Sequence, residues 1–163
     1  EQKAIYELVL ASQEAAFKAI APGKHWNAAH EATVQVITVG LVELGLLSGE
    51  VSELIASEAY KPFYMHRAGH WLGMDVHDVG DYKVGGEWRE LEVGMAMTVE
   101  PGIYIAVDNL DVAKKWRGIG VRIEDDVVVT KGGCEILTGG VPKTVAAIEA
   151  LMAEAQAARA VVA

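Results

Sequence analysis

The sequence is poor in cysteine, proline and basic residues, with one cysteine, four prolines, and 14 Lys and Arg against 23 Asp and Glu. The single cysteine, Cys134, excludes an internal disulfide and favours a reducing compartment, so we expect a cytoplasmic protein. The net charge of −9 gives little attraction for a phosphate backbone, and we therefore expect no nucleic-acid partner.

Uninterrupted apolar runs of membrane-spanning length are also missing. The most apolar stretch, "ATVQVITVGLVELGLL", contains Gln35, Glu43 and two glycines, so we expect no membrane partner. What is present is a chain of 163 residues with 52% hydrophobic content. This is enough for one compact domain, or most of one.

Apolar spacing predicts helices first and strands afterwards. Helical spacing occurs in the segments 1–20, 27–44, 50–60 and 144–160. Runs typical of strands occur in the segments 70–78, 93–107 and 119–130. β-Branched residues in "VQVITV" leave a strand open as an alternative within the second helix. Helices followed by a sheet and a closing helix indicate an α+β fold.

Three of the five histidines lie in the segment "HRAGHWLGMDVHDVG". His70 and His77 would point to opposite faces of an unbroken strand, so both reach one site only if the chain bends, for which Gly73 is the candidate. His66 and His70 have a helical ligand spacing, but Gly69 and the nearby Pro62 argue against a helix, and the zinc motif HExxH is absent. Taken singly, each histidine is more typical of a structural residue than of a ligand.

Two glutamates lie on predicted strands beside informative neighbours. Alternation places Glu100 on the same face as Thr98, and Pro101 after it indicates a strand that is at an edge, bulged or kinked. Arg122 and Glu124 share one face of the later strand. Each glutamate alone is also compatible with a solvated surface, where most charged residues lie.

The interpretation changes when the two glutamates are considered together with His70. The three residues come from three separate predicted strands, and adjacent strands can direct one side chain each into a common cleft. Two carboxylates with one imidazole suit Mn²⁺, Co²⁺ or Zn²⁺ better than a thiolate-type zinc site. The sequence therefore predicts a metal site that contains His70, Glu100 and Glu124.

The motifs "HRAGHWLGMDVHDVG", "MAMTVEPGIYI" and "RGIGVRIEDDVVVT", in this order and spacing, resemble the catalytic domain of aminopeptidase P. That family belongs with prolidase and methionine aminopeptidase to the pita-bread-fold metallopeptidases. The tail "LTGGVPKTVAAIEALMAEA" is more similar to aminopeptidase P than to prolidase. The resemblance implies that residues 1–163 are the C-terminal portion of a pita-bread catalytic domain. The fold is then incomplete, because the upstream strands with two aspartate ligands are absent.

The resemblance also implies a cofactor and site residues. It implies two divalent metal ions, usually Mn²⁺ with Co²⁺ or Zn²⁺ possible, held here by His70, Glu100 and Glu124. It implies catalytic roles for Glu100 and for His66, His77 and Arg122. It implies substrate contacts for His66, His77 and Tyr104. The family usually has glycine where this chain has Arg67, an arginine that we expect either to alter substrate preference or to pair with an acid such as Glu58.

The activity implied is release of the N-terminal residue from a peptide with proline second, by metal-activated hydroxide attack on the Xaa-Pro bond. The alternatives are a prolidase-like Xaa-Pro dipeptidase and a pita-bread module that binds without catalysis. Members of the family are often homo-oligomers, which implies a dimer or tetramer. For these 163 residues alone we expect weak or single-site metal binding and little activity.

Overall fold

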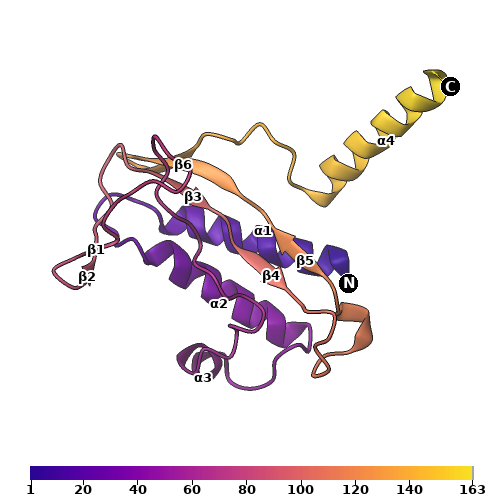
Figure 1. Cartoon of the computed structure of the whole chain (residues 1–163), viewed down its shortest axis with the longest axis horizontal. Helices are drawn as coiled ribbons and strands as arrows, with labels where there is room; N and C mark the ends of the chain where they lie inside the picture. The colour runs from indigo at the N-terminus through magenta and orange to yellow at the C-terminus, as the bar shows by residue number, and fades with distance from the viewer. Residues whose placement is uncertain (163) are drawn as a thin grey trace.

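The computed structural model describes residues 1–162, and it describes side chains as far as Gln156. The chain begins with three helices, continues with short antiparallel strands and ends with a fourth helix, which confirms the α+β order (Figure 1). The helices are α1 (Gln2–Ala19), α2 (Ala28–Glu43), α3 (Val51–Ala56) and α4 (Val145–Val162), with a short 3-10 helix at Lys114–Trp116. The strands are β1 (Lys83–Val84), β2 (Glu87–Trp88), β3 (Ala96–Val99), β4 (Gly102–Tyr104), β5 (Gly120–Arg122), β6 (Asp125–Thr130) and β7 (Gly133–Ile136).

Helices α1 and α2 pack against each other beside the sheet (Figure 1). A Cβ at Gly40 of α2 would overlap the Leu8 side chain of α1, so glycine permits the close approach of the two helices. The strand alternative for "VQVITV" is wrong. Val34, Ile37 and Leu41 are buried together at helical spacing, and this places one face of α2 in the core.

Two antiparallel ladders form the part of the sheet that matters for function. β3 pairs with β6, which also pairs with β7, and β4 pairs with β5. The β3–β6 ladder ends at the pair Val99 and Asp125, and the β4–β5 ladder begins at the pair Gly102 and Arg122. The pairing resumes after the interruption without a shift, so the two ladders share one register. Pro101 lies in the interruption between them, as the sequence predicted for a kinked strand.

The strand predicted over residues 70–78 is wrong for most of its length. Leu72 N donates to Ala96 O, Thr98 N to His70 O and Glu100 N to Ala68 O, at 2.7–3.2 Å. Residues 68–72 therefore lie alongside β3, although only an isolated bridge at Trp71 is regular. The chain then leaves the sheet in a series of bends, because glycines and aspartates favour turns over a continued ladder.

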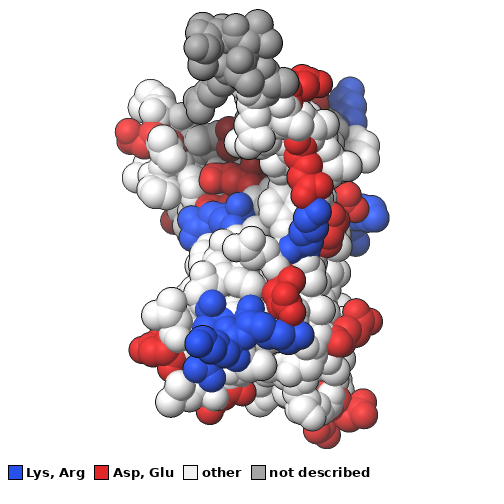
Figure 2. Space-filling model, turned by 90° about the vertical axis from the view of Figure 1, so that its right-hand side faces the viewer, with Lys and Arg blue, Asp and Glu red and all other residues white. Residues whose placement is uncertain are grey.

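Helix α4 projects from the body instead of closing over it (Figure 1). Its first turns contact α1, where Lys3 forms an ion pair with Glu149 and Tyr6 donates to the Lys143 carbonyl. Figure 2 views this side of the molecule, where basic side chains lie in small groups among acidic ones. Within the part of the chain that the structure describes, no helix has the length and apolar character needed to cross a membrane.

Candidate metal centre

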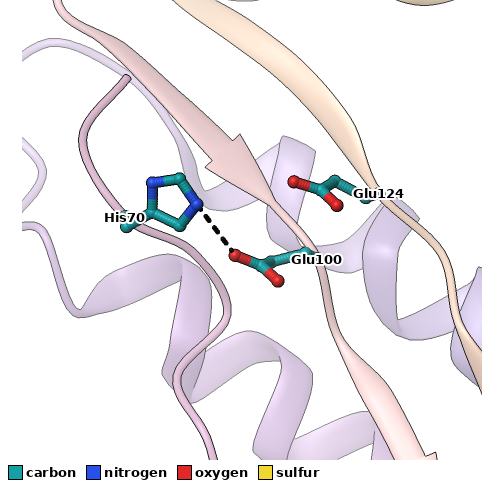
Figure 3. Close-up of side chains that lie close together, drawn as sticks. All are labelled: His70, Glu100 and Glu124. Atoms are coloured by element: carbon teal, nitrogen blue, oxygen red, sulfur yellow. Dashed lines mark ion pairs between the residues drawn. The ribbon is translucent and has the colours of Figure 1, made fainter. Parts of the chain in front are cut away.

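His70, Glu100 and Glu124 converge on one point, although they come from three separate segments (Figure 3). Each offers one ligand atom, and these atoms all lie within 4.8 Å of one another. His70 Nε2 lies 3.3 Å from Glu100 Oε1. The structure thus brings together the three residues that the sequence pattern had suggested as ligands.

The orientation of His70 is fixed from both sides. Its Nδ1 lies 2.9 Å from the Trp71 carbonyl oxygen, which can only accept, so Nδ1 carries the proton and Nε2 presents its lone pair to the site. Its backbone N–H donates to Thr98 Oγ1 at 3.0 Å, and the Thr98 hydroxyl donates to Glu100 Oε1 at 3.2 Å. Thr98 therefore couples the histidine segment to the buried glutamate.

Gly69 allows this segment to approach β3. A Cβ at residue 69 would overlap the Thr98 carbonyl oxygen, a backbone atom that cannot rotate away. The glycine inside the histidine motif thus has a steric reason, because any larger residue would push His70 away from Glu100.

Glu100 is the buried member of the group, with a side chain only 11% exposed. Its Oε2 lies 3.2 Å from Arg122 Nη1, and its Oε1 faces His70 and Thr98. A buried carboxylate requires such partners to remain charged. The contact with Arg122 therefore orients the Glu100 carboxylate toward the centre.

Glu124 completes the donor set. Burial raises the pKa of Glu124, the neighbouring charges of Glu100 and Asp126 raise it further, and His70 and Arg122 oppose the shift. Two carboxylates held this close repel each other, and a divalent cation between them would remove that repulsion. One imidazole and two carboxylates also match the ligand preferences of Mn²⁺, Co²⁺ and Zn²⁺, so the residues present fit a divalent metal ion.

The two glutamates emerge at the interruption between the ladders. Ile123 N donates to the Pro101 carbonyl at 3.3 Å, but proline has no N–H to return the bond. Gln13, buried on α1, supplies the missing donor: its Nε2 donates to Ile123 O at 3.2 Å and to Val99 O at 3.1 Å. These are the carbonyls directly before Glu124 and Glu100.

His77 lies beside His70, at the edge of the candidate centre. Its ring packs against that of His70 with centroids 4.3 Å apart, in an edge-to-face arrangement. The bend expected at Gly73 is present, and a Cβ there would overlap Asp78 Oδ2 across the turn. The bend therefore brings the two histidines together, whereas a continuous strand would have separated them.

His66, Tyr104 and Arg122 form a hydrogen-bonded chain that ends at the centre. Arg122 Nε donates to Tyr104 Oη at 2.6 Å, and Tyr104 Oη lies 2.9 Å from His66 Nε2. His66 Nδ1 donates to the Arg67 carbonyl at 2.7 Å, which leaves Nε2 to accept from the Tyr104 hydroxyl. Polar contacts therefore connect His66, Tyr104 and Arg122 with Glu100 and His70.

Arg67 does not pair with Glu58, which instead forms an ion pair with Lys61. Arg67 donates to Asn27 Oδ1 and places its guanidinium 4.5 Å from the centre of the Trp88 ring.

The sequence pattern did not identify Gln13 as a residue that supports the site. The one indication in the sequence was a glutamine on the apolar face of the first helix, because a side-chain amide that becomes buried requires hydrogen-bond partners.

Comparisons with known proteins agree with this geometry. Residues 1–131 match Metallopeptidase family M24. The chain is 52% identical, over 93% of its length, to the Xaa-Pro aminopeptidase of Haemophilus influenzae, and 49% identical, over 95%, to that of Escherichia coli. It is 41% identical, over 94%, to the Xaa-Pro dipeptidase of Homo sapiens. The chain spans only 35%, 35% and 36% of these three relatives.

Solved structures give the same result. Aminopeptidase PepP of Pseudomonas aeruginosa is 80% identical, with a TM-score of 0.94 over 95% of this chain and 35% of that chain. Aminopeptidase P of Escherichia coli with the inhibitor Pro-Leu is 49% identical, with a TM-score of 0.90 over 95% of this chain and 35% of that chain. These superpositions confirm the α+β pita-bread fold, of which this chain spans a part. By sequence, fold and the convergence of its histidine and glutamates, the chain belongs to metallopeptidase family M24.

Proposed function

We propose that this chain is the C-terminal portion of the catalytic domain of a Xaa-Pro aminopeptidase. The observation that carries the proposal is the convergence of His70, Glu100 and Glu124 in a chain of family M24. Relatives at 52% and 49% identity that are named Xaa-Pro aminopeptidases support the substrate class, a peptide with proline second. A cytoplasmic location and a dimeric or tetrameric assembly remain predictions.

His70, Glu100 and Glu124 would hold divalent metal ions, with Mn²⁺ proposed first and Co²⁺ or Zn²⁺ as alternatives. Two ions are proposed, with the remaining aspartate ligands supplied by an upstream segment. When bound, such ions supply Lewis acidity, which polarises the scissile carbonyl and lowers the pKa of water.

The protein side chains have separate roles in this proposal. Glu100 accepts the proton of the attacking water on a carboxylate oxygen, while Arg122 keeps that carboxylate oriented through the 3.2 Å contact with Oε2. His77, next to His70, donates a hydrogen bond to the carbonyl oxygen as negative charge develops there. His66 and Tyr104 contact the part of the peptide that follows the scissile bond.

The proposal is tested on the full-length protein that contains this chain. With Mn²⁺ we expect cleavage of Xaa-Pro-Yaa tripeptides and its loss in E100Q. Cleavage of Xaa-Pro dipeptides alone would favour the prolidase-like alternative, to which the human Xaa-Pro dipeptidase at 41% identity lends support.

Metal content distinguishes an enzyme from a binding module. Elemental analysis that finds about two divalent ions per full-length chain supports the metallopeptidase. A protein that stays metal-free at saturating Mn²⁺, Co²⁺ and Zn²⁺ and cleaves neither class of peptide would instead be a pita-bread module that only binds.

A further inference from the structure

Asp125 is a buried carboxylate directly after the proposed ligand Glu124. Its side chain has 0% exposure, whereas Glu124 lies on the exposed side of the chain at this point. Strand alternation directs consecutive side chains to opposite faces, so Asp125 points away from the metal centre. Its negative charge therefore cannot be neutralised by a metal ion and requires another partner.

That partner comes from the C-terminal part of the chain. Lys143 Nζ lies 2.9 Å from Asp125 Oδ1, and the Thr138 hydroxyl donates to the same oxygen at 2.5 Å. The Lys143 side chain is itself only 19% exposed. The pair is thus largely withdrawn from water, unlike the exposed ion pair of Lys3 with Glu149.

Residues 137–143, which we name the C-terminal strap, are held against the start of β6. Leu137 N donates to Asp126 O at 2.8 Å, and Asp126 N donates to Thr138 Oγ1 at 3.0 Å. The other end of the strap is held by α1, since Tyr6 Oη donates to Lys143 O at 2.6 Å. The strap lies beyond residue 131, where the match to family M24 ends.

We infer that Lys143 is a positioning residue for the metal centre. Asp125 is the first residue of β6, and it pairs with Val99, the last residue of β3. The interruption between the two ladders begins directly beside this pair. An unpaired buried carboxylate is strongly unfavourable, so without Lys143 the Asp125 side chain turns toward water and displaces the backbone. Glu124 is the adjacent residue and moves with it. This inference rests on the proposed function, because it takes Glu124 as a metal ligand.

The test compares, by isothermal titration calorimetry, the Mn²⁺ affinities of the full-length protein that contains this chain and of its K143M variant. K143M is expected to bind Mn²⁺ about 10-fold more weakly, the lower end of the effect of outer-shell changes. K143R, which keeps the charge, is expected to retain most of the affinity. Removal of a positive charge would by itself strengthen cation binding. Unchanged or tighter Mn²⁺ binding by K143M would therefore overturn the inference.

Two further variants isolate the cause. K3M removes an exposed lysine whose partner is Glu149, and it is expected to leave Mn²⁺ affinity unchanged. D125N/K143M removes both charges of the buried pair and is expected to recover most of the affinity lost in K143M. Failure of the double variant to recover would show that the unpaired charge is not the cause.

T138V keeps the inference testable if K143M does not fold. It removes the other donor to Asp125 Oδ1, together with the acceptor of the Asp126 N–H, without a change in charge, and we expect about three-fold weaker Mn²⁺ binding. Affinity equal to that of the unmodified chain would then overturn the inference.

A separate result would reject the proposed function. If the unmodified full-length protein that contains this chain binds no Mn²⁺, the metal centre itself fails. The position of Glu124 is then read from its side-chain carboxyl ¹³C signal without metal. K143M is expected to shift that signal and K3M to leave it unchanged. An unshifted signal in K143M would overturn the inference on Lys143 independently of the metal.

Discussion

The two sides of the metal centre are built differently. Glu100 and Glu124 emerge from strands held by two ladders and by Gln13, and the Glu100 side chain is only 11% exposed. His77 lies on a loop whose apolar neighbours Met74 and Val79 are 99% and 91% exposed. The carboxylate side is therefore fixed by the fold, whereas the histidine loop is held by a few local contacts.

His70 lies at the boundary between these two regions. Its segment pairs with β3, but the chain leaves the sheet two residues later. The positions of the proposed ligands therefore depend on backbone pairing, whereas the position of His77 depends on a turn. Four changes follow, ordered from the largest expected effect to the smallest, and three of them test this difference.

Loss of the buried carboxylate should have the largest effect. E100Q removes the charge of a proposed ligand that also contacts His70 and Arg122, so we expect the Mn²⁺ affinity of the full-length protein to fall by more than about 100-fold, beyond the usual range for outer-shell changes. Calorimetric titration measures this affinity. E92Q, at a glutamate whose side chain is 72% exposed, is the matched control and should bind as the unmodified chain does. Affinity of E100Q within 10-fold of the control would show that Glu100 is no ligand.

A buried histidine in the helical region should make stability depend on pH. Burial lowers the pKa of His30 on α2 to about 4 from 6.5, and the positive charge of Arg67 adds to the shift. The unfolded chain therefore binds a proton that the folded chain does not, and stability falls as pH drops from 6.5 toward 4. We expect a loss of about 3 kcal/mol in unfolding free energy at pH 4 from this residue.

Urea unfolding across this pH range, on the unmodified chain and on H30N, measures that contribution. Asparagine keeps a polar group near Tyr64 Oη, to which His30 Nδ1 is hydrogen-bonded at 3.4 Å, but it does not titrate. The two stability curves should converge as pH falls. Parallel curves would show that His30 is protonated equally in the folded and unfolded states.

The steric fit of the histidine segment against β3 should have the next largest effect. G69A places a Cβ against the Thr98 carbonyl, and because a backbone atom cannot move aside, we expect a loss of about 2 kcal/mol in unfolding free energy. G132A, where a Cβ meets nothing within 4 Å, is the control and should unfold at nearly the same denaturant concentration as the unmodified chain. Equal stability of the two variants would argue against close pairing of residues 68–72 with β3.

The corresponding change in the loop should have the smallest effect. In G73A the added Cβ meets the Asp78 carboxylate, which can rotate toward water, so we expect a loss below about 1 kcal/mol. Denaturant unfolding of G73A beside G69A gives the comparison directly. A larger loss in G73A than in G69A would reverse the assignment of rigid and loosely held regions.

The sequence was sufficient for the features that depend on local pattern. Helical spacing predicted α1 and α2, and Pro101 predicted the break in the strand that carries Glu100. The alternation of Thr98 with Glu100 placed both side chains on one face, and the structure joins them by a hydrogen bond. Such features follow from a repeat of two or 3.6 residues and require no knowledge of distant partners.

Features that depend on distant partners could not be predicted in this way. The strand expected over 70–78 ends early because a turn at Gly73 competes with pairing, and local β-propensity does not reveal which will prevail. Gln13 bonds to carbonyls far along the chain, and Lys143 neutralises Asp125 from the strap. Nothing in the sequence near Gln13 or Lys143 identifies these partners.

The shared register of the two ladders constrains where the length of the chain can vary. A residue inserted between β4 and β5, within the exposed residues 106–111, would lengthen a loop and leave both carboxylates in place. A residue inserted within β3 would rotate the following side chains, Glu100 among them, to the opposite face and remove that carboxylate from the centre. The connection between β4 and β5 can therefore vary in length, whereas a change of one residue in β3 moves a carboxylate away from the centre.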